Sequence, residues 1–71
     1  MELTLTPGET LRVERVRRGI SQAAMGKILG CTGQYVSQME RGILPSIGLE
    51  IAFAVEREIG IPAESWLKAA A

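Results

Sequence analysis

The chain has 71 residues, with eight Lys and Arg against eight Asp and Glu, so its formal net charge is zero. One Cys and no His exclude an internal disulfide, a Cys-rich or His-ligated metal site and imidazole catalysis. The length, the 46% hydrophobic fraction and the absence of an export signal or membrane span predict a single cytoplasmic domain over residues 1–71, without cofactor, metal or membrane partner.

The first six residues are expected to form a short extended arm, because Leu3 and Leu5 alternate with threonines at the period of a strand. Thr6 then supplies a hydroxyl for a helix N-cap, and Glu9, three residues later, completes a capping box. A helix is predicted to follow, to stop at a glycine at position 19, and to bury Leu11, Val13 and Val16.

Two further helices are expected in close succession. Ser21 suits the N-cap of the first, which ends at Gly30. Its inward stripe is predicted to be Ala24, Met25, Ile28 and Leu29. Thr32 suits the N-cap of the next helix, which is predicted over residues 33–41 and closed by Gly42. Val36 and Met39 are expected to face inward from it.

The last third of the chain predicts two more helices. Pro45 and Ser46 are expected to start a fourth helix that ends at Gly60, and Pro62 is expected to open a short fifth one. The inward residues should be Ile47, Ile51, Val55 and Ile59, then Trp66 and Leu67. Five short helices in so short a chain predict a compact all-α fold.

The second and third helices have the spacing of a helix-turn-helix. Gly26 stands in mid-helix, where glycine costs about 1 kcal/mol relative to alanine, which indicates that another helix crosses close to it. Gly30 can adopt the left-handed conformation of a sharp turn. The polar face of the third helix, opposite its inward residues, consists of Gln34, Ser37, Gln38 and Arg41.

The joint pattern over about residues 9–67 resembles the lambda repressor/Cro-like helix-turn-helix family. The matching motifs are Gly19-Ile20-Ser21-Gln22, Met25-Gly26, Leu29-Gly30, Val36-Ser37, Glu40-Arg41-Gly42 and Pro45-Ser46. The resemblance implies a sequence-specific regulator of transcription. It would act as a repressor that binds double-stranded DNA as a homodimer on an inverted repeat, with residues 33–41 as the recognition helix in the major groove.

The resemblance also implies individual roles. The residues expected to contact bases are Gln34, Gln38, Ser37, Gly33 and Thr32, because glutamine pairs with adenine in a bidentate manner. The residues expected to contact phosphates are Gln22, Arg41, Tyr35 and Arg18. Arg15 and Glu40 are expected to form a structural ion pair. Outside this motif, Gln34 and Gln38 would be an ordinary solvated face, and Tyr35 fits partial packing as well as a DNA contact.

Apolar residues beyond the recognition helix predict an interface. Ile43, Leu44, Leu49, Phe53 and Trp66 are expected to form an exposed patch that joins two copies of the chain.

The sequence also bears on two other classes of function. Pro7-Gly8-Glu9 near the start and Pro62-Ala63-Glu64-Ser65-Trp66-Leu67 near the end are similar to HigA-type antitoxins, which bind a toxin protein and regulate their own promoter. An enzyme is not expected, since no His base, no Asp and no phosphate-binding loop are present. The chain ends soon after the fifth helix, so no effector domain and no small-molecule ligand are expected.

The charges are unevenly distributed. Residues 10–41 hold six basic and two acidic side chains, whereas residues 43–71 hold two basic and four acidic ones. The helix-turn-helix therefore lies in a basic half of a neutral chain, which predicts weak non-specific attraction to DNA and a larger part for base contacts.

Overall fold

The computed structural model describes residues 5–70, and the side chains of residues 5–67. Five helices form the regular structure of this part of the chain, which contains no strand. They are α1 (Pro7–Arg17), α2 (Gln22–Leu29), α3 (Gly33–Arg41), α4 (Leu49–Ile59) and α5 (Glu64–Ala70). The prediction of an all-α, five-helix fold is confirmed. The expected arm falls mostly on residues 1–4, which lie outside the described residues, and residues 5 and 6 form no strand.

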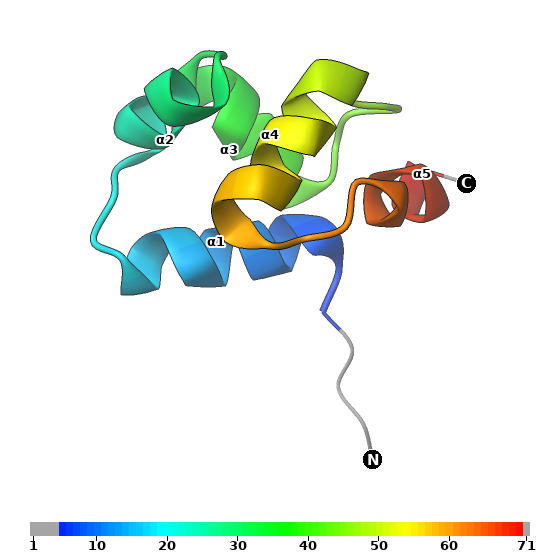
Figure 1. Cartoon of the computed structure of the whole chain (residues 1–71), viewed down its shortest axis with the longest axis horizontal. Helices are drawn as coiled ribbons and strands as arrows, with labels where there is room; N and C mark the ends of the chain where they lie inside the picture. Colours follow the sequence, from blue (N-terminus) through cyan, green and yellow to red (C-terminus); the bar gives the residue numbers. More distant parts are fainter. Residues whose placement is uncertain (1–4, 71) are drawn as a thin grey trace.

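In Figure 1, α1 lies along one edge of the molecule, with α2 and α3 together on the opposite side and α5 near the C-terminus. The contacts between helices are most extensive between α2 and α3, and α1 packs against α3 and α5. Helix α4 packs against α2. Helices α1 and α4 therefore pack against the helix-turn-helix.

The first three helices begin at the caps predicted from the sequence. The side-chain oxygens of Thr6, Ser21 and Thr32 each accept a hydrogen bond from the backbone N–H three residues later. The helices α2 and α3 end at Gly30 and Gly42, both left-handed with φ of 85° and 68°. Local hydrogen bonding and glycine freedom thus set these ends.

The capping box of α1 makes a testable contribution to acid stability. The Thr6 N–H donates to Glu9 Oε1 at 2.9 Å, and the Glu9 N–H donates to Thr6 Oγ1 at 3.1 Å. The hydrogen bond from the Thr6 backbone, and after it the Thr6 side chain, lower the pKa of the Glu9 carboxyl below its ordinary 4.5. A lowered native pKa stabilises the fold above the unfolded pKa, and this stabilisation is lost as the pH falls through the native value.

We therefore expect the Glu9→Gln variant, whose amide can still accept the bond but does not titrate, to lose less stability on acidification than the wild type. Urea unfolding at about pH 7 and about pH 3 measures this difference. The same loss in both proteins would contradict the assigned role of Glu9.

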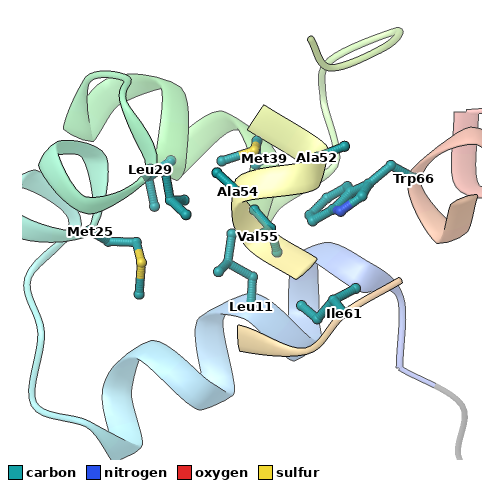
Figure 2. Close-up of a cluster of buried hydrophobic side chains, with 10 residues drawn as sticks. Leu11, Met25, Leu29, Met39, Ala52, Ala54, Val55, Ile61 and Trp66 are labelled. Atoms are coloured by element: carbon teal, nitrogen blue, oxygen red, sulfur yellow. The ribbon is translucent and has the colours of Figure 1, made fainter. Parts of the chain in front are cut away.

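The core forms where all the helices meet. Its most buried side chains are Leu11, Met25, Val36, Met39 and Val55. Figure 2 shows Leu11 of α1 facing Val55 of α4, and the Trp66 ring projecting from α5 toward α4. Ten hydrophobic residues are buried in this cluster, and each helix contributes at least one of them.

The buried side of α1 differs from the prediction. Leu11 is fully buried, but Val13 and Val16 are 43% and 59% exposed. At about 100° per residue, the face that α1 turns inward carries Gly8, Leu11 and Arg15, and the two valines fall outside it. The expectation that Val13 and Val16 belong to the core was therefore wrong.

Smaller corrections apply to α2 and α5. Met25 and Leu29 are buried as expected, but Ala24 is exposed and Ile28 is 43% exposed, because α2 buries a narrow stripe against α3. Helix α5 begins at Glu64 rather than Pro62. At its start Trp66 is buried, whereas Leu67, which was expected to face the core, is 66% exposed.

Helix α4 begins later than the sequence predicts. Residues 45 and 46 belong to the preceding loop, and the N-cap is Gly48, with extended backbone angles. Ile47 therefore precedes the helix, where it still packs against the core. The buried residues of the helix itself are Ala52, Ala54 and Val55. None of the helices in the described part of the chain is both long and apolar enough to span a membrane.

Candidate nucleic-acid interface

Helix α3 has one buried and one accessible side. Val36, Met39 and Glu40 are buried against the rest of the fold. The accessible side carries the residues that the sequence singled out: Thr32, Gln34 and Arg41 are exposed, and Ser37 and Gln38 are half-buried. The spacing of three and four residues places Gln34, Gln38 and Arg41 along one face. The structure thus places these polar side chains on one face of a helix whose opposite face is packed against the fold.

The turn between α2 and α3 is too tight for side chains at two positions. A Cβ on Gly26 would lie 2.7 Å from the Cys31 carbonyl oxygen, and one on Gly33 would lie 2.9 Å from Ala23 Cα. The close crossing expected at Gly26 is therefore confirmed. Gly33 has the same packing role, which the sequence did not reveal. With no side chain, Gly33 can offer a ligand only its backbone, and this backbone is held against α2.

A buried ion pair connects α1 to the end of α3. Arg15 Nε lies 2.6 Å from Glu40 Oε2, and Arg15 Nη2 donates to Glu40 Oε1 at 3.2 Å. The side chains are only 13% and 3% exposed. Arg15 Nη1 also donates to the Ile20 carbonyl oxygen at 2.9 Å, which holds the connection between α1 and α2. The expected pair is thus the centre of a larger network.

Gln22 belongs to that network, a contact that the sequence did not indicate. Its Nε2 donates to Glu40 Oε1 at 3.1 Å, and the side chain is half-buried. A glutamine amide has two N–H donors, so the other remains for a further acceptor. The first residue of α2 is therefore positioned by the last turn of α3.

Two more predicted site residues have contacts of their own. The Gly48 N–H donates to Tyr35 Oη at 3.1 Å, so Tyr35 holds the start of α4 and packs partly against the core. The hydroxyl hydrogen of Tyr35 remains available. Arg18 Nη1 donates to the Glu58 carbonyl oxygen at 3.0 Å, which directs part of its guanidinium toward the last turn of α4.

Gly8 is a supporting residue that sequence reasoning missed. It is buried, and a Cβ there would collide with the Met39 carbonyl oxygen and lie 3.0 Å from that of Glu40. The start of α1 therefore packs directly against the backbone of the last turn of α3. A glycine in the first turn of a helix, where alanine is favoured by about 1 kcal/mol, was the available signal.

A comparison with known protein families assigns this arrangement of helices to a family. A family model described as Helix-turn-helix matches residues 11–66, which is most of the chain. The chain is a member of the helix-turn-helix family, of the Cro/C1 type. It is accordingly a DNA-binding transcription regulator. No curated protein and no solved structure matches the chain.

The helix-turn-helix protein also exposes apolar side chains in the loop after α3 and on α4. Leu49 and Phe53, one turn apart on α4, are 60% and 53% exposed, and Ile43 is 57% exposed. Leu44 is half-buried. Trp66 is 8% exposed and belongs to the core, which confirms the inward position expected in the fifth helix and corrects the expectation that it lies in an exposed patch. Figure 2 shows the ring pointing from α5 toward α4, where it joins the core cluster.

The remaining chemically reactive group of the helix-turn-helix protein is Cys31, in the turn. Its thiol is half-buried and free, and burial raises its pKa above the ordinary 9.0, which disfavours the nucleophilic thiolate. Among the described residues, no group of three His, Cys, Asp or Glu side chains is placed to hold a metal ion. Cys31 packs against the core in the manner of a small apolar residue.

Proposed function

We propose that this protein represses transcription as a homodimer, which binds an inverted repeat and inserts one α3 helix per half-site into the major groove. The observation that carries the proposal is the exposed polar face of α3. The opposite face of this helix is buried, and a buried ion pair holds its last turn. A rigid helix with accessible glutamines can present their amides to base edges at little cost in conformational entropy.

Base contacts are assigned to Gln34 and Gln38, with Ser37, Thr32 and Gly33 at the same rim. Gln34 is exposed, so its amide is free to form the paired bonds with adenine N6 and N7. The Thr32 hydroxyl oxygen already accepts the Tyr35 N–H at 3.0 Å, but its own hydrogen can still be donated.

Phosphate contacts are assigned to Gln22, Tyr35, Arg41 and Arg18. Gln22 and Tyr35 each keep one donor hydrogen while their other contacts fix them to α3 and α4. Arg41 is exposed and forms no ion pair within the described part of the chain. Such contacts place the protein on DNA, and base contacts then select the sequence.

The dimer contact is assigned to Ile43, Leu49 and Phe53, together with the half-buried Leu44 that follows Ile43 in the chain. Burial of exposed apolar side chains is favourable by roughly 25 cal/mol per Å², and a two-fold axis would use the same residues of both copies. The antitoxin alternative would use the same exposed residues for a toxin protein. Both functions share the DNA contacts and differ in the partner.

A binding selection on random duplex DNA tests the proposal. We expect two inverted half-sites whose centres lie about one DNA turn apart, as two symmetric recognition helices require. A selected site with a single half-site would contradict the homodimer and leave the exposed apolar residues for another partner. No enrichment of any sequence would contradict sequence-specific binding.

On the selected site, the Gln34→Ala variant is expected to bind about 10- to 100-fold more weakly, which corresponds to the loss of one bidentate base contact of about 1–3 kcal/mol. Because Gln34 is exposed and has no side-chain partner here, folding should be unchanged. Affinity for an unrelated duplex is the internal control and should stay the same. An equal loss on both duplexes would show that Gln34 does not read sequence.

A further inference from the structure

A pocket opens where the start of α1, the end of α3, the following loop and α5 meet. Its volume is about 530 Å³, within the range of roughly 300–1,000 Å³ that is typical of small-molecule sites. The apolar part of its wall is formed by Pro7, Met39, Leu44, Ile47 and Trp66. This wall suits an organic molecule with an apolar body.

The indole of Trp66 leaves an unused donor in this region. Trp66 is 8% exposed, and its Nε1 is the single buried side-chain nitrogen or oxygen without a hydrogen-bond partner among the described residues. A buried donor without an acceptor costs about 1–3 kcal/mol, so an acceptor is strongly favoured here. Trp66 lines the pocket, but its Nε1 is itself covered, so an acceptor in the pocket would reach this donor only if the ring turned.

Two arginines give the same pocket an excess of positive charge. Arg12 and Arg41 line it, and neither forms an ion pair in the described part of the chain. Of the carboxylates that also line it, Glu40 is neutralised by Arg15, whereas Glu9 accepts from the neutral Thr6 N–H and keeps its charge, so one positive charge remains in excess. A negative charge is therefore the missing complement.

We propose that this pocket binds a small organic carboxylate. Its apolar body would pack against Leu44, Ile47 and Trp66. Its negative charge would be balanced by Arg12 and Arg41. No ligand was expected from the sequence, and the walls of this pocket come from segments that are far apart in the chain.

The pocket shares residues with the DNA-binding face. Gln38 and Arg41 line the pocket and also belong to the accessible side of α3. A bound carboxylate would neutralise Arg41 and compete with a DNA phosphate, so it would lower the affinity for DNA. This regulatory part rests on the proposed function, whereas ligand binding itself does not.

Ligand binding is measured without DNA. Trp66 is the only tryptophan, so the full chain gives a single indole N–H signal in a nitrogen–proton correlation spectrum. We expect benzoate to shift this signal saturably with a Kd of about 1 mM or below, and uncharged benzyl alcohol to bind about tenfold more weakly or worse. No saturable shift with up to about 50 mM benzoate, at constant ionic strength, would overturn the proposal.

A matched pair of variants tests the charge. The Arg12→Gln variant is expected to bind benzoate about tenfold more weakly, while the Arg17→Gln variant should bind it as the wild type does. Arg17 is 73% exposed, lies outside the pocket and pairs with Glu14, so it controls for the loss of one positive charge. An equal loss in both variants would reduce the effect to general electrostatics and overturn the site.

DNA binding is measured separately. Benzoate should weaken binding of the wild type to its selected site and should affect the Arg12→Gln variant much less. If the indole signal shifts but DNA affinity does not, the pocket stands and its regulatory role is overturned. If the protein selects no DNA site at all, the proposed function fails, and the indole titration still decides whether the pocket binds a carboxylate.

Discussion

Replacing Arg15 with Met is expected to lower the free energy of unfolding by about 3–5 kcal/mol. The substitution leaves the Glu40 carboxylate, 3% exposed, with only Gln22 as its side-chain partner. Removal of one member of a buried pair is this destabilising because the other charge stays desolvated without compensation. A domain of 71 residues has about 4–11 kcal/mol in total, so much of its stability should be lost.

Urea unfolding measured by circular dichroism checks this expectation. The control is Arg17→Met, which breaks an exposed pair with Glu14 and should cost about 1 kcal/mol or less. The double variant Arg15→Met, Glu40→Leu should recover part of the loss, because it removes both buried charges. Recovery stays partial because Ile20 also loses its donor. An Arg15→Met protein as stable as the control would refute the structural role of the pair.

Replacing Gly26 with Ala is expected to lower the free energy of unfolding by about 2 kcal/mol or more, although alanine is the better helix former by about 1 kcal/mol. The added Cβ would lie 2.7 Å from Cys31 O and Thr32 C and 2.9 Å from Gly33 N. All three atoms are backbone, so relief requires that α2 and α3 move apart. The same movement would displace the accessible face of α3.

The control for Gly26 is Gly48→Ser. Gly48 has an ordinary φ of −61°, and the nearest atom to its Cβ is Ile51 Cγ1 at 3.8 Å. Serine there also supplies the cap side chain that α4 lacks, so stability should stay equal or rise by a few tenths of a kcal/mol. Thermal unfolding of the two variants compares them directly. A Gly26→Ala protein at least as stable as the wild type would contradict the close crossing.

The ends of the helices were predictable because the interactions that set them are local. Thr6, Ser21 and Thr32 each bind the N–H three residues later, and this bond needs no other part of the chain. The start of α4 was mispredicted for the opposite reason. It is set by Gly48, whose N–H is bound by Tyr35 from another helix.

The candidate interface was predictable to the extent that it follows helical spacing. Gln34, Gln38 and Arg41 share one face of α3 because the helix period places them there. Of their supports, the Arg15–Glu40 pair was implied by the family resemblance, but two others were not predicted. The Gln22 bond to Glu40 and the packing of Gly8 under α3 join positions 18 or more residues apart, and no local pattern in the sequence identifies the partner in such a contact.

By itself, then, the sequence determined the class of fold, the first three helix starts, the close turn at Gly26 and the polar face of α3. These features were predictable because caps, glycine conformations and the helical period act over a few residues. Only the tertiary structure decided which face of α1 is buried, where α4 begins, and that Trp66 leaves the exposed surface and lines a pocket with Arg12 and Arg41. Burial depends on which surfaces meet, and segments distant in the chain supply those surfaces.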